Sequence, residues 1–287
     1  MPNHFVARAA QSAHRRLSRA ALLALCVTAP LASLTAPAWA VPLQARPAME
    51  QALKQPPQPV KVIEPHLSTR TQNTEVTYLG WPAPLVLDTV LGADWRKPGV
   101  DVEFRALDGY VSRIPADKFS QHRAYLVVQR VGHPDFSVNN LAQNEKNVPL
   151  GPYYLVWDNI RSPELLADGG NGWPYQVAEI KISEARSQAL LPAHLPAGLR
   201  AVATEAQTHC LSCHQINGFG GDKWPGNLAQ QARALGEPAF LRWVLAPDSV
   251  KPGTTMPPVA KLWPDAEREA LASRLLDYLR AVGAPAN

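Results

Sequence analysis

The chain has 287 residues, of which 28 are lysine or arginine and 24 are aspartate or glutamate, so its formal net charge is +4. Four arginines and no acidic residues lie in the first 40 positions, and the chain beyond them holds 24 basic and 24 acidic side chains. This balance creates no strong electrostatic field of either sign. The charge of the chain therefore does not indicate nucleic acid or anionic lipid as a partner.

The first 40 residues have the pattern of a secretory signal peptide. Three arginines between positions 15 and 19 precede an apolar run over residues 20–34, and small residues flank a tryptophan at positions 38–40. Pro30 interrupts the run, whereas a membrane span needs roughly 18 or more apolar residues. Cleavage after Ala40 is therefore favoured over a retained anchor. We expect a periplasmic protein with no membrane span after cleavage.

Cysteine usage narrows the possible chemistry. Of the three cysteines, Cys26 lies in the predicted signal peptide, and only two residues separate Cys210 from Cys213. Cys26 follows Leu25 rather than the small residue of a lipoprotein signal, so lipid attachment is the less favoured alternative. Beyond the signal peptide, this close pair would close only a poor disulfide loop.

The rest of the chain is long enough for two domains. Residues 41–74 are rich in proline without an apolar period, which is typical of an extended tether. Residues 75–190 show strand-like alternation and predict a β-rich domain. After the prolines near residue 192, the pattern over residues 195–287 becomes helical.

Six strands and one short helix are expected in the β-rich domain. Strands are predicted over residues 76–79, 100–104, 110–114, 124–131, 153–157 and 175–182, and a helix over 85–95. In the helical part, residues 199–208 have the pattern of the end of a helix. A last helix follows from the apolar stripe Leu271, Leu275, Tyr278, Leu279 and Val282, with Asp265 after Pro264 as its expected cap and Gly283 and Pro285 at its end.

The chemistry is concentrated in the segment Cys210-Leu211-Ser212-Cys213-His214. Two thiols at this spacing match the two vinyl groups of a haem, to which they can add as thioethers, and the following histidine can bind the iron. A zinc site would need further ligands at short spacing, and a thioredoxin-like pair belongs on a strand-to-helix unit. We therefore predict one covalently attached haem c, with Cys210 and Cys213 as attachment points and His214 as an axial ligand.

Met256 is the predicted second axial ligand. It lies 42 residues after His214 in the proline-framed loop 251–258, and the other methionine beyond the signal peptide, Met49, lies in the predicted tether. A methionine is often core filling, but a position between prolines in a polar loop favours ligation to iron. Rival ligands are His66, His122, His133, His194 and His209, of which His209 adjoins Cys210 on the wrong side and the others are distant in sequence.

Residues 195–287 resemble a class I c-type (mono-haem) cytochrome domain. The resemblance is carried by the segment from Cys210 to His214, called the attachment segment below, by the Met256-Pro257 loop and by the final helix. The resemblance implies an all-α domain, so the expected fold has two domains, a β-rich α+β domain followed by an all-α cytochrome c domain. It also implies that a proline carbonyl orients the proximal histidine, a role for which Pro225 is the candidate. Trp224 and Trp243 are expected to line the haem pocket, with ordinary aromatic core as the alternative.

The β-rich domain resembles the second half of the molybdopterin-binding domain of sulfite-oxidase-like enzymes. The similarity is carried by residues 78–84, 104–110 and 151–153. Those enzymes bind molybdenum through a cysteine thiolate, and residues 41–209 contain no cysteine. The resemblance therefore implies a scaffold or docking surface without the metal, with Asp108, Gly109 and Tyr110 as a structural turn.

Together these patterns favour a periplasmic mono-haem cytochrome that carries single electrons between redox partner proteins. An electron-transfer protein or subunit is favoured over a stand-alone enzyme. Two alternatives stay open: a haem-containing oxidoreductase subunit whose N-terminal domain binds a substrate or a dehydrogenase, and a haem-based ligand sensor.

Overall fold

The structure, a computed structural model, describes residues 40–184 and 189–283. The predicted signal peptide lies outside these residues except for Ala40, so export and cleavage stay predictions. The described residues belong to one compact unit. Among them, no helix is both long and apolar enough to cross a bilayer.

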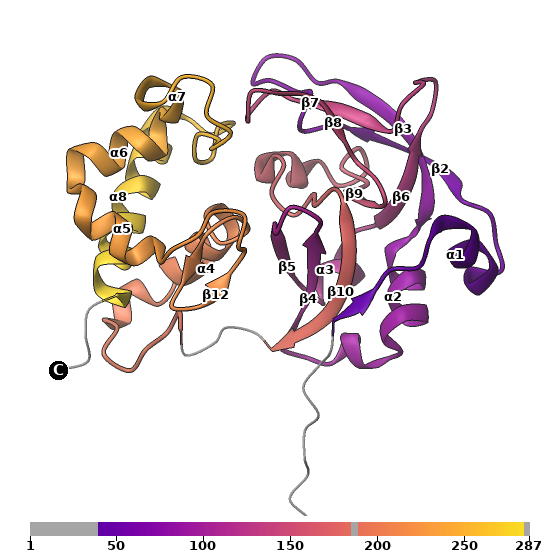
Figure 1. Ribbon diagram of the computed structural model, residues 1–287, viewed down its shortest axis with the longest axis horizontal. Helices are drawn as coiled ribbons and strands as arrows, with labels where there is room; N and C mark the ends of the chain where they lie inside the picture. The colour runs from indigo at the N-terminus through magenta and orange to yellow at the C-terminus, as the bar shows by residue number, and fades with distance from the viewer. Residues whose placement is uncertain (1–39, 185–188, 284–287) are drawn as a thin grey trace, which may run out of the picture. The chain divides into compact units, whose positions relative to one another are not determined.

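In the part of the chain that the structure describes, the fold is a β-rich α+β fold with four sheets and with helices mostly toward the C-terminus (Figure 1). One antiparallel sheet has the order β1-β10-β4-β5, formed by Val41–Pro42, Val177–Glu184, Val100–Ala106 and Val111–Pro115. A second has the order β2-β3-β6-β9, formed by Gln58–Ile63, Glu75–Pro82, Ala124–Arg130 and Tyr154–Trp157. A hairpin pairs β7 (Ser137–Asn140) with β8 (Glu145–Pro149).

The two four-stranded sheets share one hydrophobic core. Alternate residues of their strands, such as Val60 and Val62 in β2 and Val102 and Phe104 in β4, are buried in it, as the period of a strand dictates. Helix α2 (Ala83–Leu91) adds Val86 and Leu87. The six predicted strands are confirmed as β3, β4, β5, β6, β9 and β10, and the predicted helix as α2 followed by the short helix η1 (Asp94–Arg96). Two short elements, α3 (Lys118–Gln121) and η2 (Pro163–Asp168), complete this part.

Residues 41–74, for which the proline content predicts an extended tether, instead contribute strand β1, helix α1 (Arg46–Leu53) and strand β2. The prolines are compatible with these elements because of where they stand. Pro47 lies in the first helical turn, where its missing N–H costs no hydrogen bond. Pro59 lies in β2, an edge strand, which tolerates proline. Met49, at 1% exposure, anchors α1 in the core.

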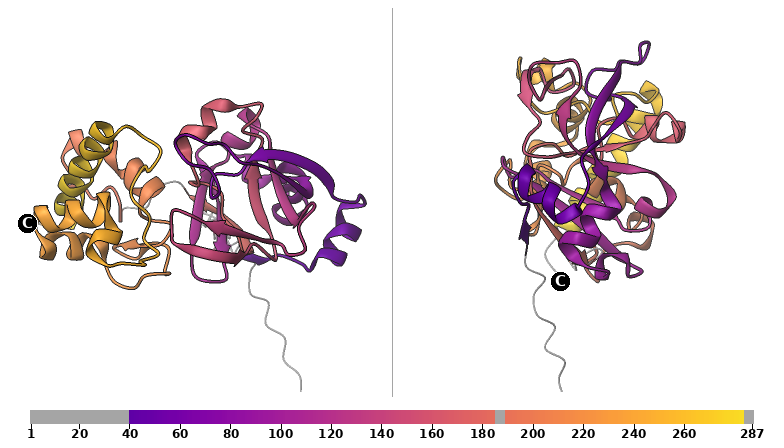
Figure 2. Two further views of the ribbon diagram at one scale, coloured as in Figure 1. Left: turned by 90° about the horizontal axis from the view of Figure 1, so that it is seen from above. Right: turned by 90° about the vertical axis from the view of Figure 1, so that its right-hand side faces the viewer.

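A second hydrophobic core begins at Leu190 and is built by the C-terminal helices. These are α4 (Val202–His209), α5 (Leu228–Leu235), α6 (Glu237–Leu245), α7 (Pro247–Val250) and α8 (Asp265–Val282), preceded by the short helix η3 (Ala197–Leu199). Helix α8 packs against α4, α5 and α6, and its predicted apolar stripe is buried. Figure 2 shows these orange and yellow helices gathered in one group.

The predicted final helix is confirmed, but not its cap. Helix α8 begins at Asp265 with Pro264 in the capping position and no side-chain capping bond. The Asp265 carboxylate instead accepts hydrogen bonds from Arg70 and Arg268. Gly283 follows the last helical residue, as expected.

The prediction of a separate all-α cytochrome c domain over residues 195–287 is wrong. That stretch contains a fourth sheet, in which β11 (Gln215–Ile216) pairs with β12 (Phe219–Gly220), and it belongs to the same compact unit as the β-rich part. The two-residue turn is Asn217-Gly218, with φ of 50° and 82°. A type I′ hairpin turn requires positive φ at both positions and prefers Asn-Gly, a signal that the helical period cannot reveal.

We expect Met49→Ala to lower the free energy of unfolding by about 2–5 kcal/mol, because it removes a fully buried side chain from the first core. The matched control Gln51→Ala, on the exposed face of the same helix, should change it by less than about 0.5 kcal/mol. Urea denaturation measures both. Equal and small effects would mean that residues 41–74 do not belong to the folded core.

Candidate functional site

Cys210, Cys213 and His214 follow helix α4 in a tight turn. The Cys210 amide donates to the Ala206 carbonyl at 2.9 Å, and the His214 amide donates to the Cys210 carbonyl at 3.0 Å. Leu211, at 1% exposure, fixes the turn in the second core. Both thiols are free. The turn therefore holds the two thiols and the imidazole in one short, anchored segment.

All the predicted site residues line a single cavity of about 770 Å³. They are Cys210, Cys213, His214, Trp224, Pro225, Trp243 and Met256. The volume lies within the usual range for small-molecule and cofactor sites. Apolar side chains from three helices, including Leu228, Phe240 and Leu279, also line it. The fold thus places Met256 on the same cavity as His214, although 42 positions separate them in the sequence.

Burial sets the protonation of the three attachment residues. It raises the pKa of the Cys210 thiol to about 12 and that of Cys213 to about 11, so both are protonated near neutral pH. Burial also lowers the pKa of His214, which keeps the imidazole neutral and able to bind a metal. Redox-active cysteine pairs have lowered thiol pKa values. The raised values here weigh against a thioredoxin-like function.

The two tryptophans and Pro225 differ in their surroundings. Trp224 is 41% exposed, and its amide donates to the Cys213 carbonyl at 3.0 Å. Trp243 is half-buried in helix α6. The Pro225 carbonyl accepts a hydrogen bond from the Gln231 side chain at 3.3 Å, so one of its lone pairs is already engaged. Its proposed role toward His214 stays a prediction.

Met256 lies in the 14-residue loop between helices α7 and α8. Its side chain is half-buried against the second core, and its amide donates to the Thr254 hydroxyl at 3.2 Å. Farther along the loop, the Val259 amide donates to the Val244 carbonyl at 2.9 Å. Loops of this length without secondary structure are uncommon in compact domains and are usually functional.

The β-rich part supplies a polar wall of the same cavity, which the sequence did not reveal. Asn140 donates to Gln143 at 2.9 Å, and the Tyr175 hydroxyl donates to the same oxygen at 3.1 Å. His66 also lines the cavity, and its ring lies edge-on to Tyr175. The polar atoms Asn140 Oδ1 and His66 Nε2 are buried without a hydrogen-bond partner among the described residues.

The turn between strands β4 and β5 contacts the attachment segment directly. The Val111 amide donates to the Ser212 carbonyl at 2.8 Å, and the Asp222 amide donates to the Gly109 carbonyl at 3.0 Å. Lys223 forms an ion pair with Asp108 at 2.8 Å. Burial is the largest single effect and would lower the pKa of Lys223, but the hydrogen bond to Asp108 and the nearby acidic groups together outweigh it and raise this pKa. The residues of this turn thus hold the attachment segment from the β-rich side.

Two of the five rival histidines line the cavity, His66 and His209. His209 Nδ1 lies 3.3 Å from the Asn171 side chain. His122, His133 and His194 have partners elsewhere, which are Ser162, Asp135 and Ala281 respectively. Distance in sequence was therefore a poor reason to set His66 aside, because sheet pairing returns its segment to the cavity.

The described residues contain no group of three or more histidine, cysteine, aspartate or glutamate side chains that could hold a metal ion. A haem does not need such a group, because the porphyrin itself binds the iron and the protein supplies axial ligands. No protein-family model matches the chain, and no curated protein matches it either.

Gly221 is a sensitive position because the hairpin packs on the attachment segment there. A Cβ at this residue would lie 2.1 Å from the Ser212 carbonyl oxygen and 3.1 Å from the Gly109 carbonyl oxygen. Both neighbours are backbone atoms, so the segment itself would have to move. We expect Gly221→Ala to cost about 1–3 kcal/mol of stability.

The matched control is Gly198→Ala, where a Cβ would meet no atom within 4 Å. It should leave the free energy of unfolding within error of the unmodified protein. Chemical denaturation measures this quantity. A Gly221→Ala variant as stable as the control would contradict the described packing.

Proposed function

We propose that this protein is a periplasmic mono-haem c-type electron-transfer protein. The observation that carries the proposal is the shared cavity, which is lined by Cys210, Cys213, His214 and Met256. Two thiols, an imidazole and a thioether are the set of side chains that covalent haem attachment with His/Met ligation requires. The size of the cavity and its mainly apolar helical wall fit the same cofactor.

Each residue has a distinct role in this proposal. The thiols of Cys210 and Cys213 would hold the haem covalently, so the cofactor would be retained without complete burial. The neutral imidazole of His214 and the thioether of Met256 would bind its iron. The haem, when bound, supplies a one-electron change of its iron, and methionine ligation raises the reduction potential.

The surroundings of the cavity add two further effects. Apolar side chains such as Leu228, Phe240 and Val244 exclude water from one side. A site of low polarity disfavours the more highly charged ferric state, which also raises the potential. On the other side, the fixed turn after α4 limits movement of the ligands. Both effects suit a carrier that exchanges electrons with redox partner proteins.

The polar wall supports a second candidate function, binding of a small ligand at the haem as in a sensor or an oxidoreductase subunit. Asn140 is 3% exposed and His66 8% exposed, and each has a buried polar atom without a partner among the described residues. Native proteins rarely leave such atoms unsatisfied, so a water molecule or a ligand is expected there. His66 is also the rival of Met256 for the iron.

The axial ligand is the most direct way to separate these candidates. We expect the ferrous protein not to bind carbon monoxide, because both axial positions are occupied. Met256→Ala should open one position, allow carbon monoxide to bind, and lower the reduction potential on the order of 0.1 V, within the about 0.8 V range that axial ligands span. Absorption spectroscopy and redox titration measure these changes.

His66→Phe is the matched comparison, since it also removes a potential ligand from the cavity wall. It should leave the spectrum and the potential nearly unchanged. If His66→Phe opens the site and Met256→Ala does not, His66 is the ligand. Binding of carbon monoxide by the unmodified ferrous protein would favour the sensor function instead.

A further inference from the structure

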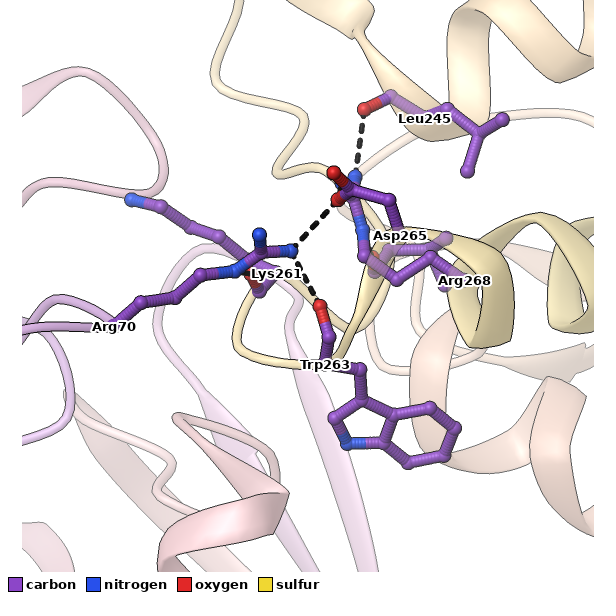
Figure 3. Close-up of polar contacts among 7 residues, drawn as sticks. Arg70, Leu245, Lys261, Trp263, Asp265 and Arg268 are labelled. Atoms are coloured by element: carbon purple, nitrogen blue, oxygen red, sulfur yellow. Dashed lines mark hydrogen bonds and ion pairs between the residues drawn. The ribbon is translucent and has the colours of Figure 1, made fainter.

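The loop that carries Met256 is held from outside by residues of the β-rich part. Arg70, in the segment between β2 and β3, donates from Nε to the Lys261 carbonyl at 2.9 Å and from Nη2 to the Trp263 carbonyl (Figure 3). The same guanidinium bonds the Asp265 carboxylate at 2.9 Å. One side chain thus joins three acceptors at the end of the loop and the start of α8.

Asn144, in the turn between β7 and β8, contacts the loop on the other side of Met256. Its side-chain amide donates to the Thr254 carbonyl at 3.2 Å and to the Asp248 carboxylate at 3.2 Å. Asp248 in turn accepts a hydrogen bond from the Gly253 amide at 2.8 Å. The β-rich part therefore binds the loop both before and after the methionine.

Further contacts connect the end of the loop to helix η2 and to α6. The Trp263 indole donates to the Ala167 carbonyl at 3.0 Å. Arg268 donates to the Val259 carbonyl at 2.9 Å and to the Leu245 carbonyl at 2.8 Å (Figure 3). The hydrogen bonds from Arg70 and Arg268 hold the pKa of Asp265 below its usual range.

We propose that Arg70 and Asn144 are positioning residues that keep Met256 on the haem iron, so that the β-rich part acts as a clamp on the ligand loop; this inference rests on the function proposed above. Methionine is a weak ligand on a 14-residue loop, so its bond to iron competes with the conformational freedom of that loop. The clamp contacts exist only when the loop lies against the β-rich part. They therefore favour the ligated state over the open one.

Arginine suits this role better than lysine. Its planar guanidinium presents several donors in a fixed arrangement and can satisfy two carbonyls and a carboxylate at once. Lysine would keep the charge but lose the arrangement. The clamp also gives the β-rich part a role that needs no metal of its own.

The test uses the full chain, matured with its haem, as the double variant Arg70→Gln/Asn144→Ala. We expect covalent haem content to be unchanged. The far-red absorption band of methionine-ligated ferric haem should weaken, carbon monoxide should bind the ferrous form about tenfold faster, and the potential should fall. Arg70→Lys should give an intermediate result.

Arg96→Gln is the matched control, because Arg96 is another exposed arginine of the β-rich part with an ion pair, to Asp88, away from the loop. It should change none of these readouts. Thermal unfolding of every variant separates a general loss of stability from a specific loss of ligation. If the double variant does not fold, Trp263→Phe replaces it with the same expected direction. This change removes the indole bond to Ala167 and reduces the ring that lies edge-on to His209.

The outcomes distinguish the two levels of the proposal. If Met256→Ala opens the site but the double variant behaves like Arg96→Gln, the clamp is wrong and the proposed function stands. If the unmodified protein carries no covalent haem, or if Met256→Ala changes nothing, the proposed ligation fails and the clamp with it.

Discussion

The contacts of residues 108–111, at the turn from β4 to β5, with residues 212–223 are the interaction on which the rest of the site depends. The Val111 amide donates to the Ser212 carbonyl of the attachment segment, and the Asp222 amide, which follows the β11–β12 hairpin, donates to the Gly109 carbonyl. The ion pair of Lys223 with Asp108 adds to this contact. Each such bond contributes only about 0.5–1.5 kcal/mol net. These bonds matter because they fix the positions of the two thiols and the imidazole relative to the cavity wall that the β-rich part supplies.

This arrangement explains why the cavity has two kinds of wall. The helical core supplies apolar side chains that suit a porphyrin, and the β-rich core supplies Asn140, Gln143, Tyr175 and His66. Neither set encloses the space by itself. With Arg70 and Asn144 on the ligand loop, the β-rich part contacts both segments that bear the proposed axial ligands. A part without cysteine can thus influence the proposed haem site through geometry and solvent exclusion.

Local patterns in the sequence predicted the elements whose period is strong. Six strands and helix α8 follow from alternation and from one apolar stripe. The haem attachment that the spacing of Cys210, Cys213 and His214 predicts stays a prediction. Strand β2 was hidden because prolines at a sheet edge look like a linker, and the β11–β12 hairpin because its signal is only the pair Asn217-Gly218. The Arg70 contacts join residues about 190 positions apart, as in Arg70 with Lys261, and the polar wall brings His66 against Tyr175. No local pattern encodes either set of contacts.

The central claim, that Cys210 and Cys213 hold a haem covalently, is tested most directly by the mass of the denatured protein. The protein should be produced in a host that attaches haem to exported chains, unfolded in acid and organic solvent, and digested. We predict one haem per chain, retained on the peptide that contains both cysteines and resistant to extraction. A peptide with two unmodified thiols, or a haem that is extracted completely, would contradict the account.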